Sequence, residues 1–333
     1  MNRIPMIARS AGRRQLLQAA AAALLGLSAL TSTSVYAQAK SVAVTAIVEH
    51  PALDAVRDGI KEELEASGFK GDKLKWQYQS AQGNPGTAAQ IARNYIGQNP
   101  DVIVAIATPS AQAVVAASKS IPTVYSAVTD PVAAQLVKSM EPSGTNVTGV
   151  SDALALEDQV NLIKKILPNV KRIGMVYNPG EANSVVVVNE LKRILPPMGI
   201  ELVEATAPRT VDITAAARNL VGKVDVIYTN TDNNVVSAYE SLVKVATDAK
   251  LPLVASDTDS VKRGAIAALG VDYRDLGRQT GKIVVRILNG EKPGAIASER
   301  STNLELYVNP KAAAAQGVTL SQELIQSAKE VLE

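Results

Sequence analysis

Short apolar runs alternate with longer amphipathic segments along most of this chain. Residues 41–48, SVAVTAIV, form a continuous apolar run rich in β-branched side chains, which predicts a strand buried on both faces. In the segment that follows, Leu53, Val56, Ile60 and Leu64 recur at helical spacing. This alternation continues toward the C-terminus, and it predicts an α/β fold of right-handed βαβ units with mostly parallel sheets.

One strand–loop–helix–strand–loop unit occurs twice. Residues 101–131 and 225–259 each begin with an aspartate before an apolar run and continue through a polar cluster into an amphipathic segment. Each then passes Ile-Pro or Leu-Pro, enters a second apolar run and closes on a Thr-Asp pair. Ligands of parallel α/β sheets bind at the carboxyl ends of the strands. The duplication therefore predicts two similar lobes whose polar loops face each other across a cleft.

The last third of the chain contains three further predicted elements. We expect a long helix over 273–288, a strand over 304–308 and a closing helix over 322–332. Earlier in the chain, Thr87 is the expected N-cap of a helix.

Composition excludes several classes of function. The chain has 333 residues, 47% of them hydrophobic but only 3% aromatic, so aliphatic side chains must build the core. Its formal net charge of +2 argues against nucleic acid as a partner. The absence of cysteine excludes disulfides, thiolate catalysis and a lipobox anchor, and the single histidine argues against Ser–His catalysis and multi-histidine metal sites. We expect no cofactor.

Residues 1–39 have the pattern of a cleaved export signal. Arginines precede an apolar stretch, and Ala37-Gln38-Ala39 is a small-residue cleavage site, with Val35-Tyr36-Ala37 as the second choice. A membrane anchor is the weaker alternative, because the apolar stretch is short, alanine-rich and followed by polar residues. The Arg13-Arg14 pair resembles a twin-arginine signal, while Sec export stays open. The expected destination is the periplasm.

The first candidate site lies where a strand gives way to a helix. Thr108, Ser110 and Ala111 stand there, and the free N–H groups of a first helical turn together with a serine hydroxyl suit a carboxylate. The alternative is that Thr108 or Ser110 only caps the helix. In the second copy, a run of polar side chains that includes Asn230 and Asp232 has the matching position, and it exceeds what one cap requires.

Acidic residues close both copies of the unit. Asp130, after Thr129, is interpreted as a helix cap because Pro131 fits a first helical turn. Asp257 is interpreted as a ligand contact that could receive an ammonium group, because Asp259 is better placed to cap the next helix.

Two further loops complete the candidate site. His50 is interpreted as a neutral contact at the mouth of the cleft, since one histidine near two carboxylates is weak evidence for a metal. The loop matching it in the other lobe presents Asn183 and Ser184 as hydrogen-bond donors. Neither a dinucleotide fingerprint nor a phosphate-binding loop occurs in the sequence, so ATP binding by that route is not expected.

Together these motifs match the pattern of one known family. The chain resembles the periplasmic substrate-binding proteins of ABC importers with the type I fold, in the family that includes tryptophan/tyrosine-type aromatic amino-acid binding proteins. The resemblance covers nearly all of the chain beyond the leader and is carried by HPALD at 50–54, ATPSAQ at 107–112, TDP at 129–131, NVTGVSD at 146–152, YNPGEANS at 177–184, PLVASD at 252–257 and ALGVDY at 268–273.

The resemblance implies two Rossmann-like lobes joined by three crossovers and closing over a small ligand. It places one lobe at 40–148 plus 273–300 and the other at 149–272 plus 301–333. The implied partners are an ABC permease and its ATPase at the inner membrane, and a monomer is expected. The ligand hypothesis is an amino acid with an aromatic side chain, although an aliphatic amino acid or another small carboxylate stays open. Its carboxylate would meet the helix start at Thr108 and Ser110, and its ammonium group would meet Asp257 or Asp232.

Two other functions fit the sequence less well, and a third fits it equally well. A regulator's effector domain would carry an N-terminal DNA-binding motif where this chain has an export signal. An exported α/β enzyme is disfavoured because the chain lacks cysteine, histidine pairs and a GxSxG elbow. A binding protein that serves a membrane sensor shares every feature named above with one that serves a transporter.

Overall fold

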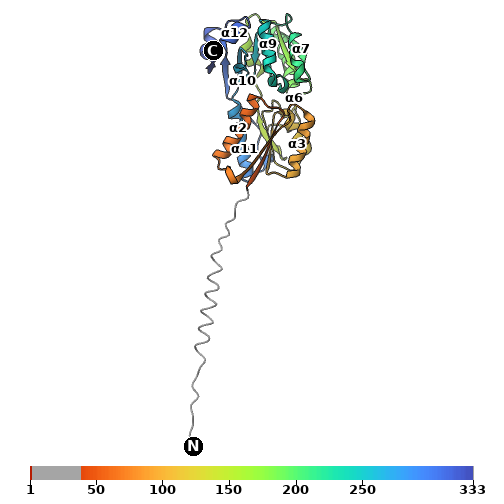
Figure 1. Cartoon of the computed structure of the whole chain (residues 1–333), viewed down its shortest axis with the longest axis vertical. Coiled ribbons are helices and arrows are strands. Elements are labelled where there is room, and N and C mark those ends of the chain that lie inside the picture. The colour runs from red at the N-terminus through yellow and green to blue at the C-terminus, as the bar shows by residue number, and fades with distance from the viewer. Residues whose placement is uncertain (2–38, 333) are drawn as a thin grey trace. The chain divides into compact units, whose positions relative to one another are not determined.

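The computed structural model describes Met1 and residues 39–332 (Figure 1). The predicted export signal thus lies almost wholly outside the described residues. Among the helices that are described, none combines the length and apolar character needed to cross a membrane. The described residues 39–332 form one compact unit that contains two sheets flanked by helices.

The first sheet has six parallel strands in the order β11-β5-β4-β3-β1-β2. Its strands are β1 (Lys40–Ala46), β2 (Leu74–Ser80), β3 (Val102–Ile106), β4 (Thr123–Ser126), β5 (Val147–Ser151) and β11 (Glu299–Arg300). Its helices are α2 (Pro51–Ala66), α3 (Pro85–Gln98), α4 (Thr108–Ala117) and α11 (Tyr273–Leu288). Every residue of β3 is buried, as the continuous apolar run predicts.

The second sheet has seven strands in the order β13-β12-β10-β9-β8-β6-β7, all paired in parallel except β10 with β12. Its strands are β6 (Arg172–Tyr177), β7 (Glu201–Thr206), β8 (Val226–Thr229), β9 (Leu253–Ala255), β10 (Ala267–Val271), β12 (Leu304–Val308) and β13 (Glu330–Val331). Its helices are α5 (Leu156–Ile166), α6 (Ala182–Ile194), α7 (Ile213–Arg218), α8 (Asn233–Ser237), α9 (Tyr239–Asp248), α10 (Thr258–Lys262), α12 (Pro310–Ala315) and α13 (Gln322–Ser327).

Short 3-10 turns complete the chain. They are η1 (Gly71–Lys73), η2 (Pro196–Met198), η3 (Thr210–Asp212) and η4 (Pro293–Ala295).

The two sheets repeat one plan, as the duplicated sequence predicts. The orders β2-β1-β3-β4-β5 and β7-β6-β8-β9-β10 match strand for strand. The aspartates that open the two copies have the same task. Asp101, before β3, accepts from the Ser41 backbone N–H at 2.7 Å, and Asp225, before β8, accepts from the Arg172 N–H at 2.7 Å. Asp101 thus ties the start of β3 to that of β1, and Asp225 ties the start of β8 to that of β6.

Two local predictions are wrong. The closing helix ends at Ser327 rather than running to 332, because residues 330–331 pair with β12 as an edge strand. The N-cap of α3 is Asn84, whose side chain accepts from the Thr87 N–H at 3.0 Å, so Thr87 is the capped residue and not the cap. The helix over 273–288 and the strand over 304–308 are confirmed.

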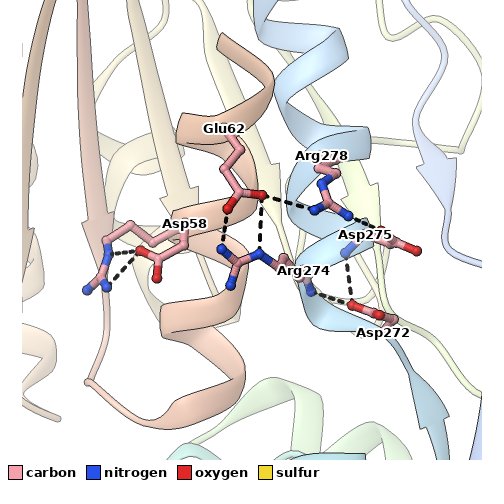
Figure 2. Close-up of polar contacts among 7 residues, drawn as sticks. Asp58, Glu62, Asp272, Arg274, Asp275 and Arg278 are labelled. Carbon is pink, nitrogen blue, oxygen red and sulfur yellow. Dashed lines mark hydrogen bonds and ion pairs between the residues drawn. The ribbon is translucent and has the colours of Figure 1, made fainter. Parts of the chain in front are cut away.

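Helices α2 and α11 pack against each other unusually closely. Gly59 and Gly277 have no room for a side chain, because a Cβ atom on Gly59 would lie 2.2 Å from the Arg274 carbonyl oxygen and one on Gly277 would lie 2.3 Å from that of Val56. Figure 2 shows the polar edge of this seam, where Glu62 of α2 meets the guanidinium groups of Arg274 and Arg278 of α11. These ion pairs are half-exposed and stabilise little, so the close backbone contact is the stronger link.

Candidate functional site

The strand ends of both sheets meet at one small cavity. Loops that follow β1, β3, β4 and β5 in the first sheet face loops that follow β6, β8, β9 and β10 in the second. The cavity measures about 10 Å³, which is room for about one water molecule. Its lining residues are His50, Ala52, Leu53, Ala107, Thr108, Ala127, Thr129, Asp152, Asn183, Thr231, Asn233, Val236, Asp257 and Tyr273. We call this the central cavity.

A larger cavity of about 400 Å³ adjoins the central cavity. The two share Thr129, Asp152 and Thr231 in their linings. Many of its other lining residues are apolar: Pro131, Val132, Met140, Leu154, Ala155, Leu156, Val186, Val187 and Tyr228. We call this the side cavity.

The structure distributes the predicted site residues over three places. Those that line the central cavity are His50, Thr108, Thr129, Asn183 and Asp257. Those that line the side cavity, apart from the shared Thr129, are Asp130 and Asn230. Those that are buried behind the cavity walls, without lining either cavity, are Ser110, Ala111, Ser184 and Asp232.

The start of α4 is strained and keeps an unused hydroxyl group. Neither Thr108 nor Ser110 caps this helix, because the N-cap position belongs to Ala107, at a φ of 72° that is rare for a residue with a side chain. The Ser110 hydroxyl is fully buried and has no hydrogen-bond partner in the described part of the chain. The capping alternative is therefore wrong, and free N–H groups with an orphaned hydroxyl remain at the helix start.

His50 is buried and neutral. It caps α2, its Nδ1 accepting from the Leu53 N–H at 3.5 Å. Burial, together with charge repulsion from Arg263, lowers the pKa of His50 to about 3, while a hydrogen bond with Asn233 acts in the opposite direction. The neutral imidazole that the sequence suggested is thus what this environment imposes.

Asn183, Ser184 and Asp232 belong to a buried network around two carboxylates. Asp232 accepts from the Ser184 hydroxyl at 2.6 Å and from the Val235 N–H at 3.1 Å, where it caps α8. Glu181 accepts from the Asn183 side-chain amide at 3.0 Å. Burial and the charge of Asp232 raise the pKa of Glu181 to about 7, and burial also raises that of Asp232.

Sequence reasoning missed Glu181. Its place before Ala182 in the YNPGEANS motif looks like an exposed loop, but the residue is only 5% exposed and orders the amide groups of Asn183 and Asn233. Only the packing of the loop after β6 against the loop after β8 buries it, and that packing leaves no local signal in the sequence.

The two acidic residues that close the repeats both act as caps. Asp257 caps α10, accepting from the Ser260 N–H at 2.8 Å and from its hydroxyl at 2.7 Å. The interpretation that Asp259 would cap instead is wrong, because Asp259 lies inside the helix and pairs with Lys262. Asp130 does cap, through the Ala133 N–H at 2.9 Å, but it caps a turn rather than a helix.

A second carboxylate that the sequence reasoning missed lies at the passage between the sheets. Asp152 directly follows β5, is 5% exposed and lines both cavities. Its Oδ2 accepts from the Tyr273 hydroxyl at 2.9 Å, while its Oδ1 has no partner among the described residues. Burial raises the pKa of Asp152, and the hydrogen bond from the Tyr273 hydroxyl offsets part of that rise. The motif NVTGVSD contains it, but only its neighbours in space give it a role.

Comparison with known proteins agrees with this geometry. A family model described as ABC transporter substrate binding protein matches residues 41–332. This chain belongs to that family. Its two sheets with matching strand orders confirm the type I periplasmic binding fold that the sequence suggested.

Several members of the substrate-binding family are similar along most of their length. A tyrosine-binding protein of Clostridioides difficile (strain R20291) is 40% identical over 81% of this chain and 79% of its own. A Streptococcus pneumonia domain solved in complex with L-Trp is 33% identical, with a TM-score of 0.85, and covers 88% of this chain and 100% of its own. The first relative is named for binding tyrosine and the second was solved with L-Trp bound, which agrees with a non-enzymatic role.

A second solved relative is less similar to this chain in structure than its sequence identity suggests. It is a ligand-free, open substrate binding protein with adhesive properties from Clostridium difficile. It is 39% identical and covers 88% of this chain and 99% of its own, but its TM-score is only 0.67.

Proposed function

We propose that this chain is an exported, periplasmic binding protein that closes two lobes over an aromatic amino acid and presents it to an ABC permease and its ATPase. The observation that carries the proposal is the central cavity, where loops from eight strand ends of two matching sheets bring buried, partly unpaired polar groups together. The tyrosine-binding and L-Trp-bound relatives support the choice of ligand.

The start of α4 supplies the proposed carboxylate site. Thr108 lines the central cavity, and the N–H groups of Thr108 and Ser110 lack acceptors within the helix, since Pro109 between them has no N–H. The orphaned Ser110 hydroxyl lies directly behind this part of the wall and would be reached when the walls separate. A ligand carboxylate could accept hydrogen bonds from both the free N–H groups and the Ser110 hydroxyl. The central cavity as it stands is far too small for an amino acid, so the walls must separate for the ligand to enter.

Closure of the lobes is supported by comparison. The fold agrees better with the L-Trp-bound relative than with the ligand-free, open one, at TM-scores of 0.85 and 0.67, although the open relative is the more identical in sequence. We propose that the moving lobes are 40–148 plus 273–300 and 149–272 plus 301–333. A ligand that contacts both lobes favours the closed arrangement by its differential affinity for it.

Calorimetric titration of the mature protein tests this function. We expect micromolar or tighter binding of L-tyrosine, L-tryptophan or L-phenylalanine, and none of L-leucine or myo-inositol at the same concentrations. Small-angle scattering with and without the bound amino acid should show a smaller radius of gyration in the complex. Binding of myo-inositol with no response to any amino acid would overturn the ligand class.

A further inference from the structure

The proposed function leaves open which carboxylate receives the ammonium group of the ligand. One carboxylate oxygen of Asp257 accepts from the Ser260 N–H, and the other accepts from the Ser260 hydroxyl. Asp232 is likewise engaged at both oxygens, by the Ser184 hydroxyl and the Val235 N–H. Both are held by the helices they cap, so a ligand would compete with those bonds.

Asp152 differs from both. Its Oδ1 is buried and has no hydrogen-bond partner within the described chain, although the residue lines the central cavity. A buried carboxylate oxygen without a hydrogen-bond donor destabilises the free protein, and a ligand that supplies a donor removes this penalty on binding. Its other oxygen is held by the Tyr273 hydroxyl at 2.9 Å, so the carboxylate is already oriented.

The charge of the central cavity favours a cation at this point. The ionisable groups among its described lining residues are Asp152, Asp257, the neutral His50 and Tyr273, and no lysine or arginine belongs to the lining. A positively charged group entering beside Asp152 therefore meets no like charge in the wall. The low dielectric of a buried site strengthens its attraction to the carboxylate.

We propose that Asp152 is the acceptor of the ligand's ammonium group and that Tyr273 positions its carboxylate. This inference rests on the proposed amino-acid function. Asp152 also lines the side cavity, so an amino acid held there by its ammonium group directs its side chain toward Tyr228 and the apolar wall around it.

Analogues of tyrosine that each lack one group test the assignment. The probes are L-tyrosine, 3-(4-hydroxyphenyl)propanoate, which lacks the amino group, and tyramine, which lacks the carboxylate. Calorimetry would measure all three on the wild type, Asp152→Asn, Tyr273→Phe and the matched control Asp257→Asn. Circular dichroism and thermal melting check that each variant is folded.

Asp152→Asn should weaken L-tyrosine binding by about 30-fold or more, because it removes the buried charge that faces the ammonium group. Binding of 3-(4-hydroxyphenyl)propanoate should change by less than about threefold, so the preference for the amino group collapses. Tyr273→Phe should weaken L-tyrosine several-fold and reduce the same preference in part. Asp257→Asn should leave the preference intact.

Three outcomes would overturn the inference. If Asp152→Asn keeps the wild-type preference for L-tyrosine over its deaminated analogue, Asp152 does not meet the ammonium group. If Asp257→Asn abolishes that preference instead, the acceptor is Asp257. If the wild type binds no aromatic amino acid, the proposed function fails first, and the titration of the unmodified protein shows this by itself. Should Asp152→Asn not fold, an unchanged preference in Tyr273→Phe would count against the pair.

Discussion

Replacing His50 with asparagine should change how the stability of this protein depends on pH. Burial and Arg263 lower the pKa of His50 from 6.5 to about 3, so the folded protein keeps the imidazole neutral while the unfolded chain protonates it. Stability from this source is complete above pH 6.5 and is lost as the pH falls toward 3. Asparagine is a good N-cap and does not titrate, so His50→Asn keeps the cap of α2 and removes the pH dependence.

The magnitude follows from linkage. At about pH 5, protonated imidazole outnumbers neutral imidazole about 30-fold in the unfolded chain, which costs the wild type about 2 kcal/mol of stability. The folded imidazole is neutral at this pH, so the figure depends on the unfolded pKa alone. At about pH 3 the loss is about 4 kcal/mol, and below it the loss approaches about 5 kcal/mol.

Urea unfolding without ligand, at about pH 7.5 and about pH 5, measures this effect. The stability of His50→Asn relative to the wild type should rise by about 2 kcal/mol between the two conditions. Carboxylates such as Glu181 titrate in both proteins and cancel in the difference. A relative stability that stays constant within about 0.5 kcal/mol would show that the folded His50 titrates normally, and the buried, neutral description would be wrong.

Three other substitutions test the fold and the site. Gly149→Ala should destabilise the protein by several kcal/mol in thermal melts, because the new Cβ would lie 2.2 Å from the Tyr125 carbonyl oxygen. The control Gly97→Ala, with no described atom within 4 Å of its Cβ, should be neutral or stabilising. Equal melting points of the two variants would contradict the close approach at Gly149. Asp225→Ala should cost about 1–3 kcal/mol in urea unfolding, because two backbone N–H groups at the start of β6 lose their acceptor, and a loss below about 0.5 kcal/mol would refute that role. Ser110→Ala should leave the melting point of the free protein nearly unchanged but weaken L-tyrosine about tenfold in calorimetry, and unaltered affinity would remove the α4 start from the ligand site.

Local patterns were sufficient to predict most of the fold. The bounds of α11 and β12 are right because their signals are local, and the long helix begins at the residue after the Asp272 cap. The duplicated unit was visible because both copies keep an aspartate, a strand and a polar loop in the same order. The last residues of the chain were wrong because pairing of residues 330–331 with β12 depends on a partner more than twenty positions away.

The candidate site was harder to predict from sequence. Choosing between Asp257 and Asp259 as the cap requires the backbone angles of the loop, which neighbouring elements set. Glu181 and Asp152 look like ordinary loop acids in the sequence, and only the meeting of loops from two sheets buries them. Burial from distant packing is what turns such a residue into a ligand contact or a positioning group, and it has no signature at the residue itself.

The close backbone contact between α2 and α11 at Gly59 and Gly277 limits where the two sheets can twist relative to each other. Helix α11 starts at Tyr273, two residues after β10 of the second sheet ends, yet its backbone lies against that of α2 with no side chain between them. It cannot slide along α2 without steric overlap, so it behaves as a fixed arm of the first sheet. On this crossover, one of three between the sheets, a twist would then fall on the short link before Tyr273. A ligand held by Asp152, the partner of Tyr273, would therefore bind beside one of the links through which the two sheets are joined.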